Sequence, residues 1–122
     1  MSDYHLLGLG NSSSVIRKVE VQRWGNELLF NCLYEPYNSR QPYQLIFSNT
    51  LDIRWNVHDT DRLEVPMVDF VGLIIGEENH KKPAIVTTEV FEISVLYESL
   101  SVRTASEFKQ VIYHSPKTAQ PE

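Results

Sequence analysis

Hydrophobic and polar residues alternate along several short runs of this chain, which is the pattern of strands that are buried on one face. The clearest run spans residues 51–57, where Leu51, Ile53, Trp55 and Val57 alternate with Asp52, Arg54 and Asn56. Successive side chains on a strand point to opposite faces, so this run has one apolar and one polar face. We expect a half-buried strand whose Arg54 face lies on the surface.

A second alternating run, residues 91–103, changes phase in its middle. Its apolar residues fall on odd positions up to Tyr97 and on even positions from Leu100. Such a change needs either a turn into a partner strand or a bulge that inserts one extra residue. Glu98 and Ser99 suit a two-residue hairpin turn poorly, because those turns favour glycine and asparagine. We therefore predict a bulge there, within one long bent strand.

Other stretches have the composition of strands. Residues 15–23 and 28–34 are rich in apolar and β-branched side chains, and Trp24-Gly25-Asn26-Glu27 between them predicts a tight reversal. The segments 43–47 and 83–88 have a similar composition. All these strands are too close together in sequence for crossover helices, so we expect mostly antiparallel pairing.

One helix is expected, near the C-terminus. Thr104-Ala105-Ser106-Glu107 matches a capping box. Phe108, Val111 and Ile112 then follow at the spacing of one helical face. An edge strand over residues 108–113 is the alternative.

These elements predict an all-β fold with one short C-terminal helix. An antiparallel two-sheet sandwich is favoured, and a jelly roll or small barrel is the alternative. We expect a flexible N-terminal lead-in over residues 1–14, a single β domain over residues 15–114 and a frayed tail over residues 115–122.

Composition narrows the classes of partner. The chain has 122 residues and a formal net charge of −5, with no long basic run. A nucleic-acid binder usually carries a basic patch, so we expect no nucleic-acid partner. The N-terminus has no basic segment followed by an apolar one, and no segment approaches the roughly 20 apolar residues of a membrane span. These features predict a soluble, cytoplasmic protein without a membrane partner.

The sequence contains no assembled catalytic motif. Cys32 is the one cysteine and lies in an apolar run, which is typical of a small core residue. The four histidines are scattered, with no spacing that would place two imidazoles on one face. No Gly-x-Ser-x-Gly elbow is present. We expect no metal, no cofactor and no catalytic residues, which favours a role other than catalysis.

Two polar clusters are candidates for function. In the loop 35–43, Tyr37, Arg40 and Tyr43 are residue types common at protein interfaces, so they predict a partner-binding loop. The alternative is a connection whose tyrosines fold back over the end of the sheet. In the second cluster Asp59 or Asp61 could orient His58 as a general base, although a simple polar turn is favoured.

The favoured function is therefore a non-enzymatic protein-interaction module. Its partner would be another protein or a second copy of this chain, in a homodimer. The alternative is a small-molecule-binding β-barrel or jelly-roll protein with a pocket between the sheets, including an enzyme whose motifs are weak.

Overall fold

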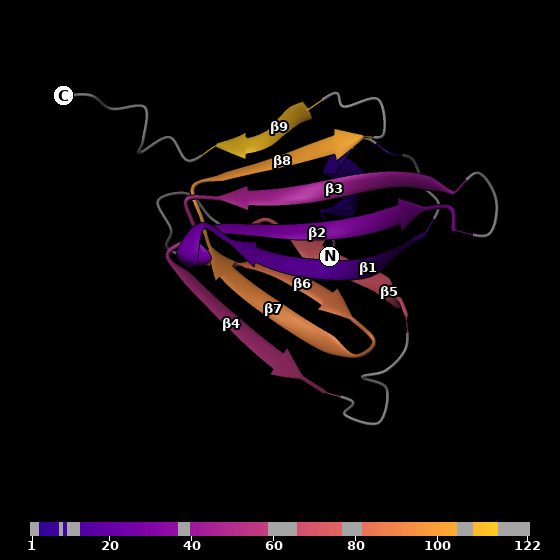
Figure 1. Ribbon diagram of the computed structural model, residues 1–122, viewed down its shortest axis with the longest axis horizontal. Coiled ribbons are helices and arrows are strands. Elements are labelled where there is room, and N and C mark those ends of the chain that lie inside the picture. The colour runs from indigo at the N-terminus through magenta and orange to yellow at the C-terminus, as the bar shows by residue number, and fades with distance from the viewer. Residues whose placement is uncertain are drawn as a thin grey trace.

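Antiparallel strands make up almost the whole computed structural model, which confirms the all-β class. The structure describes residues 3–7, 9, 13–36, 40–58, 66–76, 82–104 and 109–114. Within these residues nine strands form one sheet in the order β4-β7-β6-β5-β1-β2-β3-β8-β9 (Figure 1). The strands are β1 Ser14–Gln22, β2 Glu27–Tyr34, β3 Gln41–Ser48, β4 Asp52–Val57, β5 Val68–Ile74, β6 Ala84–Thr88, β7 Phe91–Leu96, β8 Ser99–Thr104 and β9 Lys109–His114. No described helix is long and apolar enough to cross a membrane.

The reversal predicted between the first two strands is confirmed. β1 and β2 form a hairpin in which Gln22 pairs with Glu27. Between them the short 3-10 segment η2 (Arg23–Gly25) has positive φ angles of 53°, 61° and 96°. Three successive left-handed residues reverse the chain tightly, and they leave Trp24 fully exposed at the tip.

The predicted bulge near Glu98, within one long bent strand, is wrong. β7 ends at Leu96, β8 begins at Ser99, and the two strands lie in different halves of the sheet (Figure 1). Ser48 pairs with Ser99 and Asp52 pairs with Leu96, so residues 49–51 face residues 97–98. The β3–β4 and β7–β8 segments therefore bend together from one half of the sheet into the other.

The inner faces of the two halves share one core. The half that contains β1, β2, β3 and β8 contributes side chains such as Phe30 and Leu45, and the other half contributes Val86 and Ile93. All four are fully buried. Because the strands form one continuous sheet, the predicted sandwich of two separate sheets is not confirmed.

The predicted C-terminal helix is wrong, because residues 109–114 form the edge strand β9. β9 pairs antiparallel with β8, for example Val102 with Gln110. Ile112 packs against the core, whereas Val111 is 55% exposed. A helix of a few residues has a costly nucleus, and the free edge of β8 offers ladder hydrogen bonds instead.

The N-terminal residues in the described range contact the sheet. Tyr4–Leu7 form a 3-10 helix, η1, and Leu7 is 2% exposed. The backbone N–H of Asp3 donates to the carbonyl of Leu73, and its carboxylate accepts from the N–H of Ile75 at 2.9 Å. These bonds fix η1 against β5.

Candidate functional site

A row of four polar residues crosses the sheet on the face that points away from the core. Lys18, Asn31, Gln44 and Arg103 are consecutive cross-strand partners on β1, β2, β3 and β8. Each of these strands also carries core side chains at alternate positions, such as Cys32 beside Asn31. We call these four residues the polar row.

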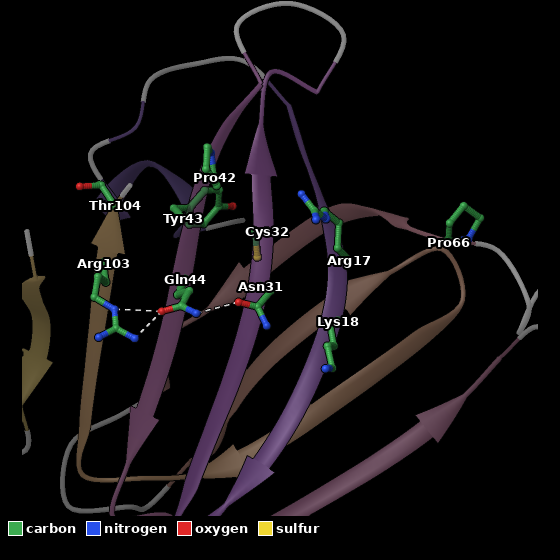
Figure 2. Close-up of a pocket in the computed structure, with 10 residues that line it drawn as sticks. All are labelled: Arg17, Lys18, Asn31, Cys32, Pro42, Tyr43, Gln44, Pro66, Arg103 and Thr104. Atoms are coloured by element: carbon green, nitrogen blue, oxygen red, sulfur yellow. Dashed lines mark hydrogen bonds between the residues drawn. The ribbon is translucent and has the colours of Figure 1, made fainter. Parts of the chain in front are cut away.

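Hydrogen bonds run along the polar row in one direction. Arg103 donates from Nε and Nη2 to Oε1 of Gln44, at 2.9 and 2.6 Å. Gln44 donates from Nε2 to Oδ1 of Asn31 at 2.7 Å, and Asn31 donates from Nδ2 to the Glu20 carboxylate at 3.1 Å. Figure 2 shows Arg103, Gln44 and Asn31 joined across three neighbouring strands. The cation at one end and the carboxylate at the other fix the orientation of both amides.

The neighbouring positions on the same face are apolar and buried. Leu29 and Ile46 form the cross-strand pair two residues from Asn31 and Gln44, and they are 6% and 3% exposed. A polar group next to such side chains is partly shielded from water, which strengthens its hydrogen bonds. The polar row is therefore expected to be rigid.

A pocket of about 430 Å³ lies over the polar row. It is lined by Arg17, Lys18, Asn31, Cys32, Pro42, Tyr43, Gln44, Pro66, Arg103 and Thr104 (Figure 2). Five of these residues belong to the neighbouring strands β2 and β3. Arg17 and Lys18 stand on β1, and Arg103 and Thr104 stand on β8 (Figure 2).

The charge of this pocket is opposite to that of the whole chain. Among the described lining residues three are cationic, namely Arg17, Lys18 and Arg103, and none is acidic. The chain as a whole carries a formal net charge of −5. Lys18 pairs with Glu20 at 3.5 Å, but in the described part of the chain no ion pair joins Arg17 or Arg103 to a carboxylate. The arrangement can attract and hold an anion.

Behind the pocket, the hydroxyl groups of Tyr4, Ser14 and Tyr43 form a hydrogen-bonded chain in which Ser14 and Tyr43 are buried and Tyr4 is half-buried. Tyr4 donates to Oγ of Ser14 at 3.1 Å, and Ser14 and Tyr43 are joined by a hydrogen bond of 2.8 Å. Burial raises the pKa of Tyr43 far above its ordinary value, and it also raises the pKa of Tyr4. These hydroxyls stay protonated and hold the ends of β1 and β3 together.

Cys32, the cross-strand partner of Tyr43, is a buried thiol. Burial raises its pKa far above the ordinary value, and a hydrogen bond with Tyr43 offsets only part of that effect. The thiolate is the nucleophile and the metal ligand, so a buried neutral thiol performs neither role. No group of three or more histidine, cysteine or acidic side chains that could hold a metal occurs among the described residues.

The two described residues of the predicted partner-binding loop, Arg40 and Tyr43, do not share one surface. Tyr43 is 3% exposed and its side chain belongs to the core, although the residue also borders the pocket on the other face of the sheet. Arg40 is exposed and donates from Nη1 to the carbonyl of Pro36 at 3.2 Å. Tyr37 lies outside the described residues. The role of this loop in binding stays a prediction.

The second predicted cluster is described only in part. His58 is exposed at the end of β4, and its backbone N–H donates to the carbonyl of Val90 at 2.8 Å. Asp59 and Asp61 lie outside the described residues. A general-base arrangement at His58 therefore stays a prediction as well.

The sequence carries a weak signal for the polar row, which the pattern analysis missed. Asn31 and Gln44 are single polar residues inside the strand-like apolar runs 28–34 and 43–47. A lone amide in such a run needs a hydrogen-bond partner, so it marks a position worth testing. Which residues lie opposite it depends on strand register, which the sequence does not specify.

The chain was also compared with known proteins. It matches no protein-family model, no curated protein and no solved structure.

Proposed function

We propose that this protein is a non-enzymatic binding protein for a small organic anion, which it holds in the pocket over the polar row. The observation that carries the proposal is the set of three cationic side chains in a pocket without an acidic lining residue in the described part of the chain. Few, well-placed polar groups in a concave site are typical of small-molecule recognition. The sequence alternative of a small-molecule-binding protein is related to this proposal, but it expected the pocket between the sheets and not on the outer face of one sheet.

The geometry of Arg103 supports an anionic group as the ligand. Its Nε and Nη2 both donate to Gln44, so its guanidinium is held in one orientation. The Nη1 group makes no bond to a described residue. A fixed guanidinium with free donors suits a carboxylate or phosphate oxygen, because charge-assisted hydrogen bonds are the stronger ones.

The chemistry of the pocket supports binding over catalysis. Its described lining contains no histidine or carboxylate that could act as a general base. The two groups with reactive potential, Cys32 and Tyr43, are kept protonated by burial. The amides of Asn31 and Gln44 can position a ligand but transfer no proton at neutral pH.

Citrate is a suitable probe for this proposal. Titration at constant ionic strength, followed by amide NMR signals, is expected to shift the side-chain amides of Asn31 and Gln44 in a saturable way. Arg103→Gln should weaken citrate binding by about tenfold, since it removes a charge-assisted contact. Arg54→Gln is the matched control, because the Arg54 side chain is 80% exposed on β4 and does not line the pocket.

Three outcomes of this titration are informative. Saturable binding that Arg103→Gln weakens and Arg54→Gln leaves unchanged supports the proposal. Equal weakening by both variants would reveal general charge screening, and linear shifts without saturation would reveal no site; either result overturns it. Inorganic phosphate in a parallel titration distinguishes a preference for phosphate from a preference for carboxylate.

The protein-interaction module is the second candidate function. Apolar side chains are exposed on β4 and just before it, among them Leu51 at 70% and Trp55 at 47%. Exposed apolar side chains that lie together often mark a protein-binding surface.

A further inference from the structure

We propose that the free edge of β4 pairs with β4 of a second copy of this chain, so that the two sheets become one antiparallel sheet. The inference deepens the second candidate function, the interaction module. It does not depend on anion binding, because neither Asp52 nor Arg54 of β4 lines the pocket over the polar row.

The first argument is the unpaired backbone of β4. This strand stands at one end of the sheet order and pairs with β7 along its whole length. No other described strand lies against it. The backbone N–H of His58 donates to Val90, just before β7. Along an antiparallel strand the backbone groups of every second residue point to the same neighbour, so those of Asp52, Arg54 and Asn56 also point toward β7. Ile53, Trp55 and Val57 therefore direct theirs to the free edge, where they can pair with another strand.

The second argument is the apolar side chains along this edge. Trp55 and Val57 are 47% and 38% exposed, although they occupy the core-facing side of β4. Leu51, which precedes the strand, is 70% exposed. Trp55 is held against Phe91, with ring centroids 5.7 Å apart. Covering these side chains with another apolar strand would stabilise the assembly.

The third argument is that the edge complements itself. A twofold axis at Ile53 places Asp52 opposite Arg54 of the second copy, and it does so twice. Opposite charges directly across a ladder stabilise it, whereas like charges destabilise it. The next register would place Arg54 opposite Arg54 of the second copy and is disfavoured.

Self-complementarity is the reason for naming a second copy as the partner. A twofold dimer uses the same patch on both subunits, so its residues must match their own symmetry mates. In β4 the charged pair Asp52 and Arg54 satisfies this condition. Within one chain the carboxylate of Asp52 already accepts a hydrogen bond from Nε of Arg54 at 3.0 Å. Both side chains are exposed, so each can bond to the second copy instead.

Sedimentation velocity across a wide range of protein concentration tests the inference. The wild-type chain is expected to sediment as a monomer at low concentration and as a dimer at high concentration. Asp52→Arg and Arg54→Asp should each raise the dimer Kd by about tenfold, since each creates two like-charge pairs. The double variant, in which both changes are combined, should restore the dimer because the charges are exchanged.

The controls keep the test specific. Val71→Ser removes an exposed apolar side chain from β5 and should leave the dimer unchanged. Thermal unfolding shows whether each variant is folded. A chain that stays monomeric at every concentration, or a double variant as weak as the single ones, overturns the inference. Citrate titration of the same variants separates this result from the anion-binding proposal.

Discussion

The aromatic rings of Phe47 and Tyr97 meet edge to face, with centroids 5.0 Å apart and planes at 86°. Phe47 lies near the end of β3, and Tyr97 lies in the bend between β7 and β8. The hydroxyl of Tyr97 also donates to the carbonyl of Ile75 at 2.9 Å. Tyr97 therefore links Phe47 of one half of the sheet to Ile75 beside the other half, at the place where the chain crosses between them.

Truncation of Phe47 should destabilise the whole fold. The side chain is fully buried, so Phe47→Ala leaves a cavity and is expected to lower the free energy of unfolding by about 3–5 kcal/mol. Val71→Ala, at a position 61% exposed, should change it by less than about 0.5 kcal/mol. Urea denaturation of both variants measures the difference, and equal effects would contradict the assigned core.

The thiol of Cys32 should be unreactive in the folded protein. The residue is 2% exposed and burial raises its pKa, so both access and the thiolate fraction are low. We expect slow labelling by a disulfide reagent at pH 8 in buffer and rapid labelling in urea. Rapid labelling of the native chain at the rate of the unfolded one would show that β2 opens readily.

Stability should fall at alkaline pH. The pKa values of Cys32, Tyr43 and Tyr4 are all raised by burial, so these groups keep their protons in the folded state. The unfolded thiol loses its proton above about pH 8.5 and unfolded tyrosines above about pH 10. From there the unfolded chain binds fewer protons than the native one, and the free energy of unfolding falls as pH rises toward the raised native values.

Cys32→Ala isolates the part that the thiol contributes. Between about pH 8.5 and 10 one such group lowers the free energy of unfolding by up to about 1.4 kcal/mol per pH unit. Urea denaturation at several pH values should give a shallower slope for the variant than for the wild type. Identical slopes would mean that the thiol is not desolvated in the native state.

Much of the fold follows from local patterns. Residues 52–57 form the strand β4 with its Arg54 face on the surface, although Trp55 and Val57 on its apolar face are more exposed than a half-buried strand predicts. The reversal at Trp24–Glu27 joins β1 to β2. In both cases neighbouring residues decide the outcome, through side-chain alternation or through backbone preference at Gly25. Such features require no knowledge of the rest of the chain.

Features that depend on distant pairing were wrong or missed. For residues 108–113 a helix was favoured over an edge strand, but residues 109–114 pair with the open edge of β8 as the edge strand β9. The phase change near Glu98 was attributed to a bulge, although it marks a crossing between sheet halves that also involves β3 and β4. The polar row depends on the register of four strands. A register is set by long-range packing, so no single segment encodes it.

Gly25 and Gly76 have the same backbone conformation but differ in the space around them, so alanine substitutions at the two positions can be compared directly. Both have positive φ, at 96° and 94°. A Cβ on Gly76 would lie 2.6 Å from the carbonyl oxygen of Lys82 and 2.9 Å from Pro83, whereas a Cβ on Gly25 would meet nothing within 4 Å. Gly25→Ala should therefore cost only the backbone strain, roughly 1 kcal/mol, because open space surrounds it.

Gly76→Ala adds a backbone clash to the same strain. The carbonyl of Lys82 cannot move aside as a flexible side chain would, so the β5–β6 connection must shift. We expect a loss of about 3 kcal/mol or more in the free energy of unfolding, and a lower Tm than that of Gly25→Ala. Urea denaturation and thermal scans of the two variants, made side by side, measure this difference. Equal losses would show that the chain around Lys82 does not lie against Gly76 in solution.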